Sequence, residues 1–183
     1  MGSLKVGLLP CLKRRAQERA PVAMPDRTGE SISPRDVSGL PWWVSEVAEI
    51  RDERGAVVVL PEGASVPHGF DAKRVYFLYT DLPSAQRGNH AHTRLHQVIV
   101  CLTGSVTVEL DNGRVTETVR LESPNIALTV GPLVWRRLHT FDPGTICAVL
   151  ASEPYDPEDY LHTYEDFIKH LDDHVARSGG AAS

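Results

Sequence analysis

The chain has 183 residues, 42% of them hydrophobic, and a formal net charge of −5 at pH 7. A chain of this length can bury its own core as one domain, and its acidic balance argues against nonspecific nucleic-acid binding, so an anionic ligand needs a local basic patch. No segment approaches the roughly 20 apolar residues that span a bilayer, and the three cysteines are too scattered for a disulfide framework, so we expect a cytoplasmic protein.

The N-terminal residues differ in composition from the rest of the chain. Residues 1–43 mix charge, proline and small polar residues without apolar periodicity, and we expect a flexible N-terminal extension there. A single domain is predicted over 44–176, followed by a disordered tail at 177–183.

Short apolar segments separated by turn signals follow from Trp42 onward. The predicted strands are 44–50, 56–62, 73–80, 95–102, 105–110, 114–121, 126–130, 134–141 and 145–152. Segments 105–110 and 114–121 alternate polar and apolar residues around a DNG hairpin turn, whereas HQVIVCL is almost continuously apolar and should be buried on both faces. The spacing predicts an all-β fold, a jelly-roll sandwich or barrel of antiparallel strands.

The C-terminal segment changes to a helical pattern. Tyr160, Tyr164, Phe167, Ile168 and Leu171 recur at helical spacing behind acidic residues, which predicts one or two short C-terminal helices. We expect Tyr155, Tyr160 and Tyr164 to pack these helices on the barrel, and His162, His170 and His174 to be solvated.

Three histidines lie within seven positions of the segment RGNHAHTRLHQ. His90 and His92 are two apart, so on an extended strand they share a face, and His96 would share it if the strand ran straight. Such residues can hold a metal, move protons or lie on a strand surface.

The segment RGNHAHTRLHQVIVCLTGS resembles the first motif of the cupin superfamily, in which a glutamate ligand follows the histidine pair. Here Gln97 stands in the glutamate position, while the motif glycine is present as Gly104. In VGPLVWRRLHTF, which resembles the second motif, Trp135 stands in the turn, and only the distant His139 could replace the expected histidine ligand. We therefore predict no metal site and assign the histidine pair to proton transfer, with His96 outside the chemistry.

Three longer stretches are similar to the sugar-nucleotide 3,4-ketoisomerases, a WxcM-like, RmlC-like family of the cupin superfamily. They are FDAKRVYFLYTDLPSAQRGNHAHTRLHQVIVCLTGSVTVEL, LTVGPLVWRRLHTF and VLASEPYDPEDYLHTYEDF, and the resemblance runs from about residue 46 to 167. It implies a cupin jelly-roll barrel that acts on a dTDP-linked 4-keto-6-deoxyhexose without metal or cofactor. It also implies a homodimer with exchanged N-terminal strands.

The implied reaction moves a ketone from C4 to C3 through an enediol, so it needs a base at carbon and a group that carries a proton between the two oxygens. Histidine suits both tasks near neutral pH. By resemblance, His90 is the base at carbon, His92 is the shuttle between the oxygens, and Tyr76 is the hydrogen-bond donor to the developing enediolate.

Three further residues are assigned to substrate binding. By resemblance, Arg87 binds the diphosphate or orients a sugar oxygen, and Arg54 lies near the sugar, where its Arg-Gly pair favours the galacto-configured product over the gluco product. Trp135 is expected either to stack on the thymine or sugar or to pack in the barrel core. Two alternatives remain open: a 3,5-epimerase of the same nucleotide sugar, and a non-catalytic cupin that binds sugar nucleotides.

Overall fold

The computed structural model of the chain describes residues 40–60, 71–80 and 82–179. The predicted extension at 1–43 lies almost wholly outside these residues, and its predicted boundary falls inside the first strand. The strands are β1 Trp42–Glu46, β2 Glu49–Asp52, β3 Gly55–Val58, β4 Arg74–Tyr79, β5 Arg87–His92, β6 Gln97–Thr103, β7 Val106–Asp111, β8 Thr116–Leu121, β9 Ile126–Val130, β10 Trp135–His139, β11 Ile146–Ala151 and β12 Tyr160–Leu161. A 3₁₀ turn, η1, covers Pro157–Asp159, and one helix, α1, covers Tyr164–Gly179. No helix in the described part is long and apolar enough to cross a membrane.

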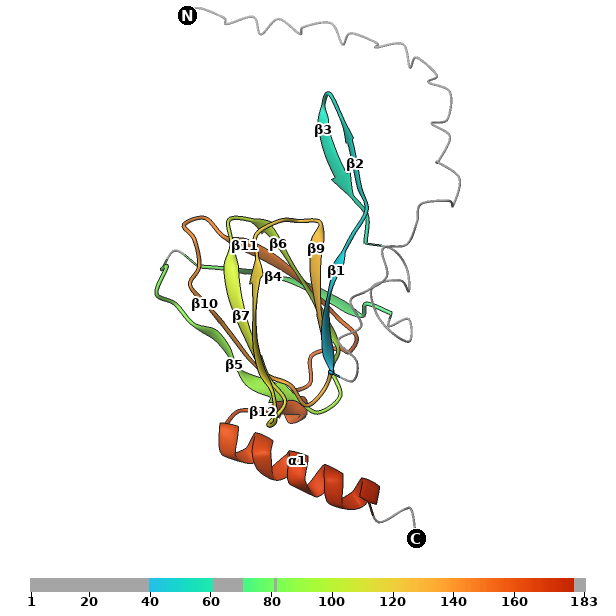
Figure 1. The fold of residues 1–183 in the computed structure, drawn as a ribbon, viewed down its shortest axis with the longest axis vertical. Helices are drawn as coiled ribbons and strands as arrows, with labels where there is room; N and C mark the ends of the chain where they lie inside the picture. The colour runs from blue at the N-terminus through green and yellow to red at the C-terminus, as the bar shows by residue number, and fades with distance from the viewer. Residues whose placement is uncertain (1–39, 61–70, 81, 180–183) are drawn as a thin grey trace, which may run out of the picture. The chain divides into compact units, whose positions relative to one another are not determined.

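Two five-stranded antiparallel sheets form the barrel (Figure 1). One has the order β1-β9-β6-β11-β4 and the other β12-β5-β10-β7-β8, while β2 and β3 pair separately as a hairpin. The inward side chains of both sheets form the main core, which includes Trp42, Ile99, Val108, Leu128 and Val149. Trp42 is buried, and its indole donates to Glu117 of the opposite sheet over 2.8 Å. The predicted all-β antiparallel fold is confirmed.

Strand β6 is buried on both faces, as its apolar composition predicts. Ile99 and Cys101 face the main core, whereas Val98 and Val100 form a second cluster on the outer face, where Val58 from the hairpin packs against them. The predicted DNG hairpin is also present: β7 pairs with β8 around Gly113, whose φ of +81° suits glycine.

The strand boundaries near the histidines differ from the prediction. The segment 44–50 is divided between β1 and β2, and RGNHAH forms its own strand, β5, in a different sheet from β6. The chain bends after His92 and re-enters extended structure only at Gln97. His96 is therefore not on the histidine strand, and its even spacing from His90 carries no information about its face.

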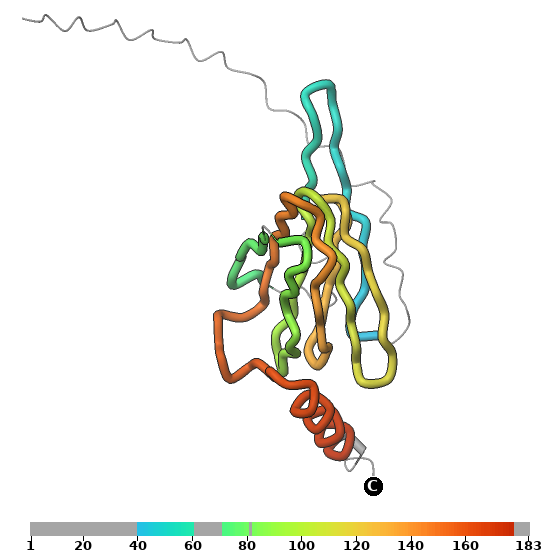
Figure 2. Tube along the Cα trace, turned by 90° about the vertical axis from the view of Figure 1, so that its left-hand side faces the viewer, coloured from blue at the N-terminus to red at the C-terminus, as the bar shows by residue number. Residues whose placement is uncertain are grey.

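The C-terminal segment closes one end of the barrel (Figures 1 and 2). Strand β12 pairs with β5, so that Tyr160 is opposite His92. The Thr163 hydroxyl accepts from the Asp166 amide and donates to its carboxylate, a reciprocal cap that starts α1. Phe167 on α1 is buried between Trp135 and Tyr164. The expected short C-terminal helices are thus one 3₁₀ turn and one α-helix.

Because Phe167 is the buried anchor of α1, its truncation should loosen the helix. Phe167→Ala should lower the free energy of unfolding by about 3 kcal/mol, through lost burial and the cavity left behind. Chemical denaturation measures this loss, and the exposed Val175→Ala on the same helix should change the value by less than about 0.5 kcal/mol. Equal losses in the two variants would show that Phe167 does not anchor the helix.

Candidate active site

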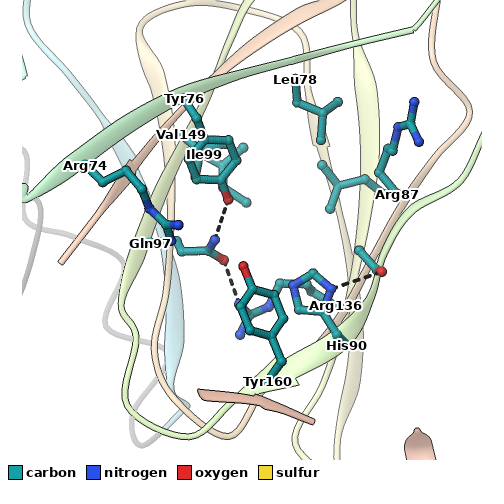
Figure 3. Close-up of a pocket in the computed structure, with 12 residues that line it drawn as sticks. Arg74, Tyr76, Leu78, Arg87, His90, Gln97, Ile99, Arg136, Val149 and Tyr160 are labelled. Atoms are coloured by element: carbon teal, nitrogen blue, oxygen red, sulfur yellow. Dashed lines mark hydrogen bonds between the residues drawn. The ribbon is translucent and has the colours of Figure 1, made fainter. Parts of the chain in front are cut away.

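A pocket of about 310 Å³ opens in the barrel and is lined by residues of both sheets (Figure 3). Its apolar wall consists of Leu78, Ile99, Leu138 and Val149, and its polar groups are Arg74, Tyr76, Arg87, His90, Gln97, Arg136 and Tyr160. Three of these are arginines, and the described lining contains no acidic residue. The pocket is thus the local basic patch that an acidic protein needs to bind an anionic ligand.

A bulge in β5 turns His90 toward the pocket. The pairing of β5 with β10 skips Asn89, so that Arg136 is opposite His90 and Arg137 is opposite Gly88. Gly88 has a φ of +79°, and a Cβ there would lie 2.7 Å from the Arg136 carbonyl oxygen. Only glycine fits this close approach, and bulges of this kind commonly redirect a side chain at a functional site.

The hydrogen bonds of His90 define which ring nitrogen is basic. Its Nδ1 lies 3.0 Å from the carbonyl oxygen of Gly88, and a carbonyl can only accept, so Nδ1 carries the proton and Nε2 keeps its lone pair. Burial, and then the charge of Arg136, lower the pKa of His90 to about 4. The ring is therefore a neutral base at pH 7.

His92 lies behind the pocket rather than in its lining. It is 1% exposed, its ring centroid is 4.9 Å from that of His90, and its Nδ1 lies 3.0 Å from a carboxylate oxygen of Asp159. Burial and the charge of Arg136 lower its pKa. The Asp159 carboxylate also accepts from Thr93 and the Arg94 amide, and we assign a neutral His92 ring that donates to it from Nδ1. Its Nε2 is buried with no hydrogen-bond partner among the described residues.

Tyr76 belongs to a hydrogen-bonded chain of residues that line the pocket (Figure 3). Arg136 donates to the Gln97 side-chain oxygen over 2.6 Å, and the Gln97 amide nitrogen donates to the Tyr76 hydroxyl over 2.7 Å. Burial raises the pKa of Tyr76, so the phenol keeps its proton at neutral pH.

Tyr160 lines the pocket and does not simply pack the helix on the barrel, as the sequence pattern suggested. Its ring centroid is 5.0 Å from that of His90 and 4.3 Å from that of His92. The helical spacing was misleading here, because Tyr160 belongs to the two-residue strand β12. The YDPEDY motif was the available signal for both Tyr160 and Asp159.

Two predicted binding residues lie outside this pocket. Arg54 is in the β2–β3 turn, where it pairs with Asp52 and its side chain is 75% exposed. Trp135 packs edge-on against Tyr164 and also against Phe167, which places it under α1 and outside the lining of this pocket. Arg87, in contrast, lines the pocket as expected.

Sequence reasoning missed Arg74 and Arg136 as pocket residues. On β4, Arg74, Tyr76 and Leu78 alternate with exposed residues, and this period-2 pattern could have identified the inward face. Arg74 lies over the rings of Tyr76 and Tyr155. His139 does not line the pocket; its Nδ1 is bonded to Thr140.

The residues around His90 suit a proton-transfer site better than a metal centre. No group of three His, Cys, Asp or Glu side chains with ligand spacing occurs in the described ranges. The oxygen of Gln97 is already bonded to the buried Arg136. This guanidinium would repel a metal cation at His90, because both would occupy the same low-dielectric region.

Comparisons with known proteins identify a family. A family model described as FdtA: WxcM-like, C-terminal matches residues 42–172. The TDP-4-oxo-6-deoxy-alpha-D-glucose-3,4-oxoisomerase of Aneurinibacillus thermoaerophilus is 42% identical over 123 residues, which make up 67% of this chain and 87% of that protein.

Solved structures of 3,4-ketoisomerases are similar in fold as well. A variant of QdtA from Thermoanaerobacterium thermosaccharolyticum, in complex with TDP-4-keto-6-deoxyglucose, matches with a TM-score of 0.68 at 34% identity, covering 72% of this chain and 94% of that one. The WlaRB TDP-quinovose 3,4-ketoisomerase of Campylobacter jejuni matches with a TM-score of 0.66 at 35% identity, covering 70% and 97%. The cupin jelly-roll expectation is thereby confirmed.

The protonation state of His90 can be measured directly. Because burial and Arg136 both disfavour the imidazolium, the His90 ring signals in an NMR titration should stay at their neutral positions from pH 8 to pH 5, consistent with a pKa of about 4. The spectrum of His90→Asn assigns the signals. A midpoint near pH 6.5 would show that neither effect acts on this ring.

Proposed function

We infer the function of this chain from the FdtA family of WxcM-like proteins, to which it belongs: it is a TDP-sugar 3,4-ketoisomerase. The substrate is a TDP-linked 4-keto-6-deoxyhexose, and the enzyme is an isomerase that exchanges a ketone and a neighbouring hydroxyl. The observation in the structure that best supports this function is the neutral His90 in a pocket with three arginines.

The carbon step is proposed to use His90 and Tyr76. The Nε2 of His90 takes the proton from C3, the C–H electrons form the C3–C4 double bond, and the electrons of the C4 carbonyl move onto its oxygen. Tyr76 donates a hydrogen bond to that oxygen as its charge develops. When the C3 oxygen loses its proton, the double bond collapses to a C3 ketone, and His90 delivers a proton to C4 after its Nε2–H has exchanged with solvent. The proton count is unchanged, as an isomerisation requires.

The oxygen step is proposed to use His92, acting from behind the pocket wall. Because His92 is buried, it needs a carrier to reach the sugar oxygens. Tyr160 supports this role, since it lines the pocket and its ring lies 4.3 Å from that of His92. Its hydroxyl can protonate the C4 oxygen and accept the proton of the C3 hydroxyl in return.

Substrate binding is proposed to depend on Arg87 and Arg74. Both line the pocket, and both can donate to the diphosphate of the nucleotide. No acidic side chain of the described lining opposes this charge.

We further propose a homodimer that exchanges N-terminal strands. On the edge strand β4, Val75, Phe77 and Tyr79 are 55%, 62% and 67% exposed on one face, and the hairpin exposes Ile50 and Val57. Exposed apolar rows of this kind are typical of protein interfaces.

In such a dimer, Arg54 of the partner subunit would reach the sugar, which accounts for its absence from the pocket of its own chain. Its Arg-Gly pair favours the galacto-configured 3-keto product, which an aminotransferase can convert into an amino sugar. The buried free thiols Cys101 and Cys147 suit a cytoplasmic location.

One specific observation favours the epimerase alternative. A 3,5-epimerase pairs a histidine with a carboxylate and a tyrosine donor, and His92, Asp159 and Tyr160 form such a group. However, the His92–Asp159 pair is buried and outside the pocket lining, while His90 bonds to a backbone carbonyl instead of a carboxylate. The geometry favours the ketoisomerase.

Incubation of the metal-stripped protein with TDP-4-keto-6-deoxyglucose in deuterated water, followed by NMR, tests the reaction. We expect deuterium at C4 and a ketone at C3, and His90→Asn should lower kcat at least about 100-fold through loss of the base. The folded control His170→Asn, on α1, should retain full activity. Exchange at C3 and C5 with the ketone still at C4 would indicate an epimerase, and no exchange would indicate a binding protein. Near-native turnover of His90→Asn would refute the assignment of the base.

Subunit mixing tests the shared site. Arg54→Ala should lose activity at least about tenfold, as expected for a charged contact to the substrate. A heterodimer of Arg54→Ala with His90→Asn, purified through two different tags, should recover about half of the wild-type activity, because one of its two sites then has both residues. If Arg54 acts within its own chain, the heterodimer will have only about half the activity of the Arg54→Ala homodimer, because its second site lacks His90. Elution of the wild type as a monomer would refute the dimer.

A further inference from the structure

We propose that Gln97 is a positioning residue that fixes the direction in which the Tyr76 hydroxyl donates its proton. The role rests on the proposed ketoisomerase function, in which Tyr76 donates to the enediolate oxygen. Gln97 itself acts through Tyr76, by holding the phenol in the orientation that this step requires.

The orientation of the Gln97 amide follows from Arg136. A guanidinium has only donors, so the side-chain atom of Gln97 that lies 2.6 Å from Arg136 Nη1 must be the oxygen. The second terminal nitrogen of Arg136, Nη2, donates to the Val134 carbonyl over 2.9 Å, which holds the guanidinium in place. The amide nitrogen of Gln97 then faces the Tyr76 hydroxyl at 2.7 Å (Figure 3).

The orientation of Tyr76 follows from Gln97 in turn. An amide nitrogen only donates, so the phenol oxygen accepts this bond, and its own proton must point elsewhere. Among the described residues, no acceptor for that proton lies within hydrogen-bond distance, while Tyr76 lines the pocket. The sugar oxygen in the pocket is therefore the natural acceptor.

A carboxylate at position 97 would reverse this polarity. It would accept from Arg136 and also from the Tyr76 hydroxyl, and so withdraw the phenol proton from the substrate. It would also neutralise Arg136, which has no acidic partner within ion-pair distance in the described part of the chain. With the amide, the phenol stays a donor to the pocket and the positive charge remains available to the enediolate.

A comparison of Gln97→Glu with Gln97→Met tests the orientation. Glutamate is isosteric and can pair with Arg136, so a merely structural role predicts that it is tolerated better than methionine. Reversed polarity predicts the opposite: Gln97→Glu should lower kcat about 100-fold with KM changed less than about threefold, and more than Gln97→Met does. Thermal unfolding checks that both variants fold, and Gln86→Glu, an exposed residue outside the pocket lining, controls for the added charge.

A double-mutant cycle identifies Tyr76 as the group through which Gln97 acts. Tyr76→Phe should lower kcat at least about 100-fold in the wild type but less than about threefold in Gln97→Glu, where the phenol proton is already withdrawn. Equal losses in both backgrounds, or a kcat of Gln97→Glu above half the wild-type value, would overturn the proposal.

A readout without turnover separates this proposal from the proposed function. With ¹³Cζ-labelled tyrosine, assigned by Tyr76→Phe, the phenol of Tyr76 should titrate at least about one pH unit higher in Gln97→Glu, because a carboxylate replaces the N–H that stabilises the phenolate. An unchanged titration would refute the orientation even if the wild type is an isomerase. A raised titration in a protein that never isomerises the sugar would leave the orientation standing and refute the function.

Discussion

The candidate site depends on one buried cation. Arg136 is 2% exposed, and burying an isolated charge is costly unless its hydrogen bonds are made. Its two terminal nitrogens donate to Gln97 and to the Val134 carbonyl, not to a carboxylate, and its Nε has no hydrogen-bond partner among the described residues. The charge therefore has no ion-pair partner beside the pocket, where it adds to the effect of burial in lowering the pKa of His90 and fixes the Gln97 amide that contacts Tyr76. A base that stays neutral and a phenol that donates both follow from this placement.

The strand pattern could be predicted from the sequence because side-chain periodicity is local. The alternation in VTVEL and the continuous apolar run of β6 gave the correct burial, since each pattern reflects which faces of a strand are covered. The motifs also marked His90, Tyr76 and Arg87 as candidate site residues, and all three line the pocket. Their detailed roles stay proposals.

Arg136 was missed because its environment depends on pairing between distant strands. Arg136 and Arg137 are adjacent, and nothing in WRRLH states which of them faces inward. In the structure Arg137 pairs with Glu109 at the protein surface, whereas Arg136 turns toward the pocket, and the bulge at Asn89 sets the register opposite it. Tyr160 and Asp159 were missed for a similar reason: a two-residue strand is too short to produce a periodic signal, and Asp159 meets His92 across 67 positions of the chain.

The contact between Asp159 and His92 has a consequence for the order in which the site is assembled. Asp159 and Tyr160 follow the other strands of both sheets in the chain, and β12 is an edge strand that pairs only with β5, so it can dock last, onto strands that already pair with one another. Until it docks, the buried His92 has no carboxylate to hold its ring, and the pocket lacks one wall. The site is thus complete only when this short edge strand is in place.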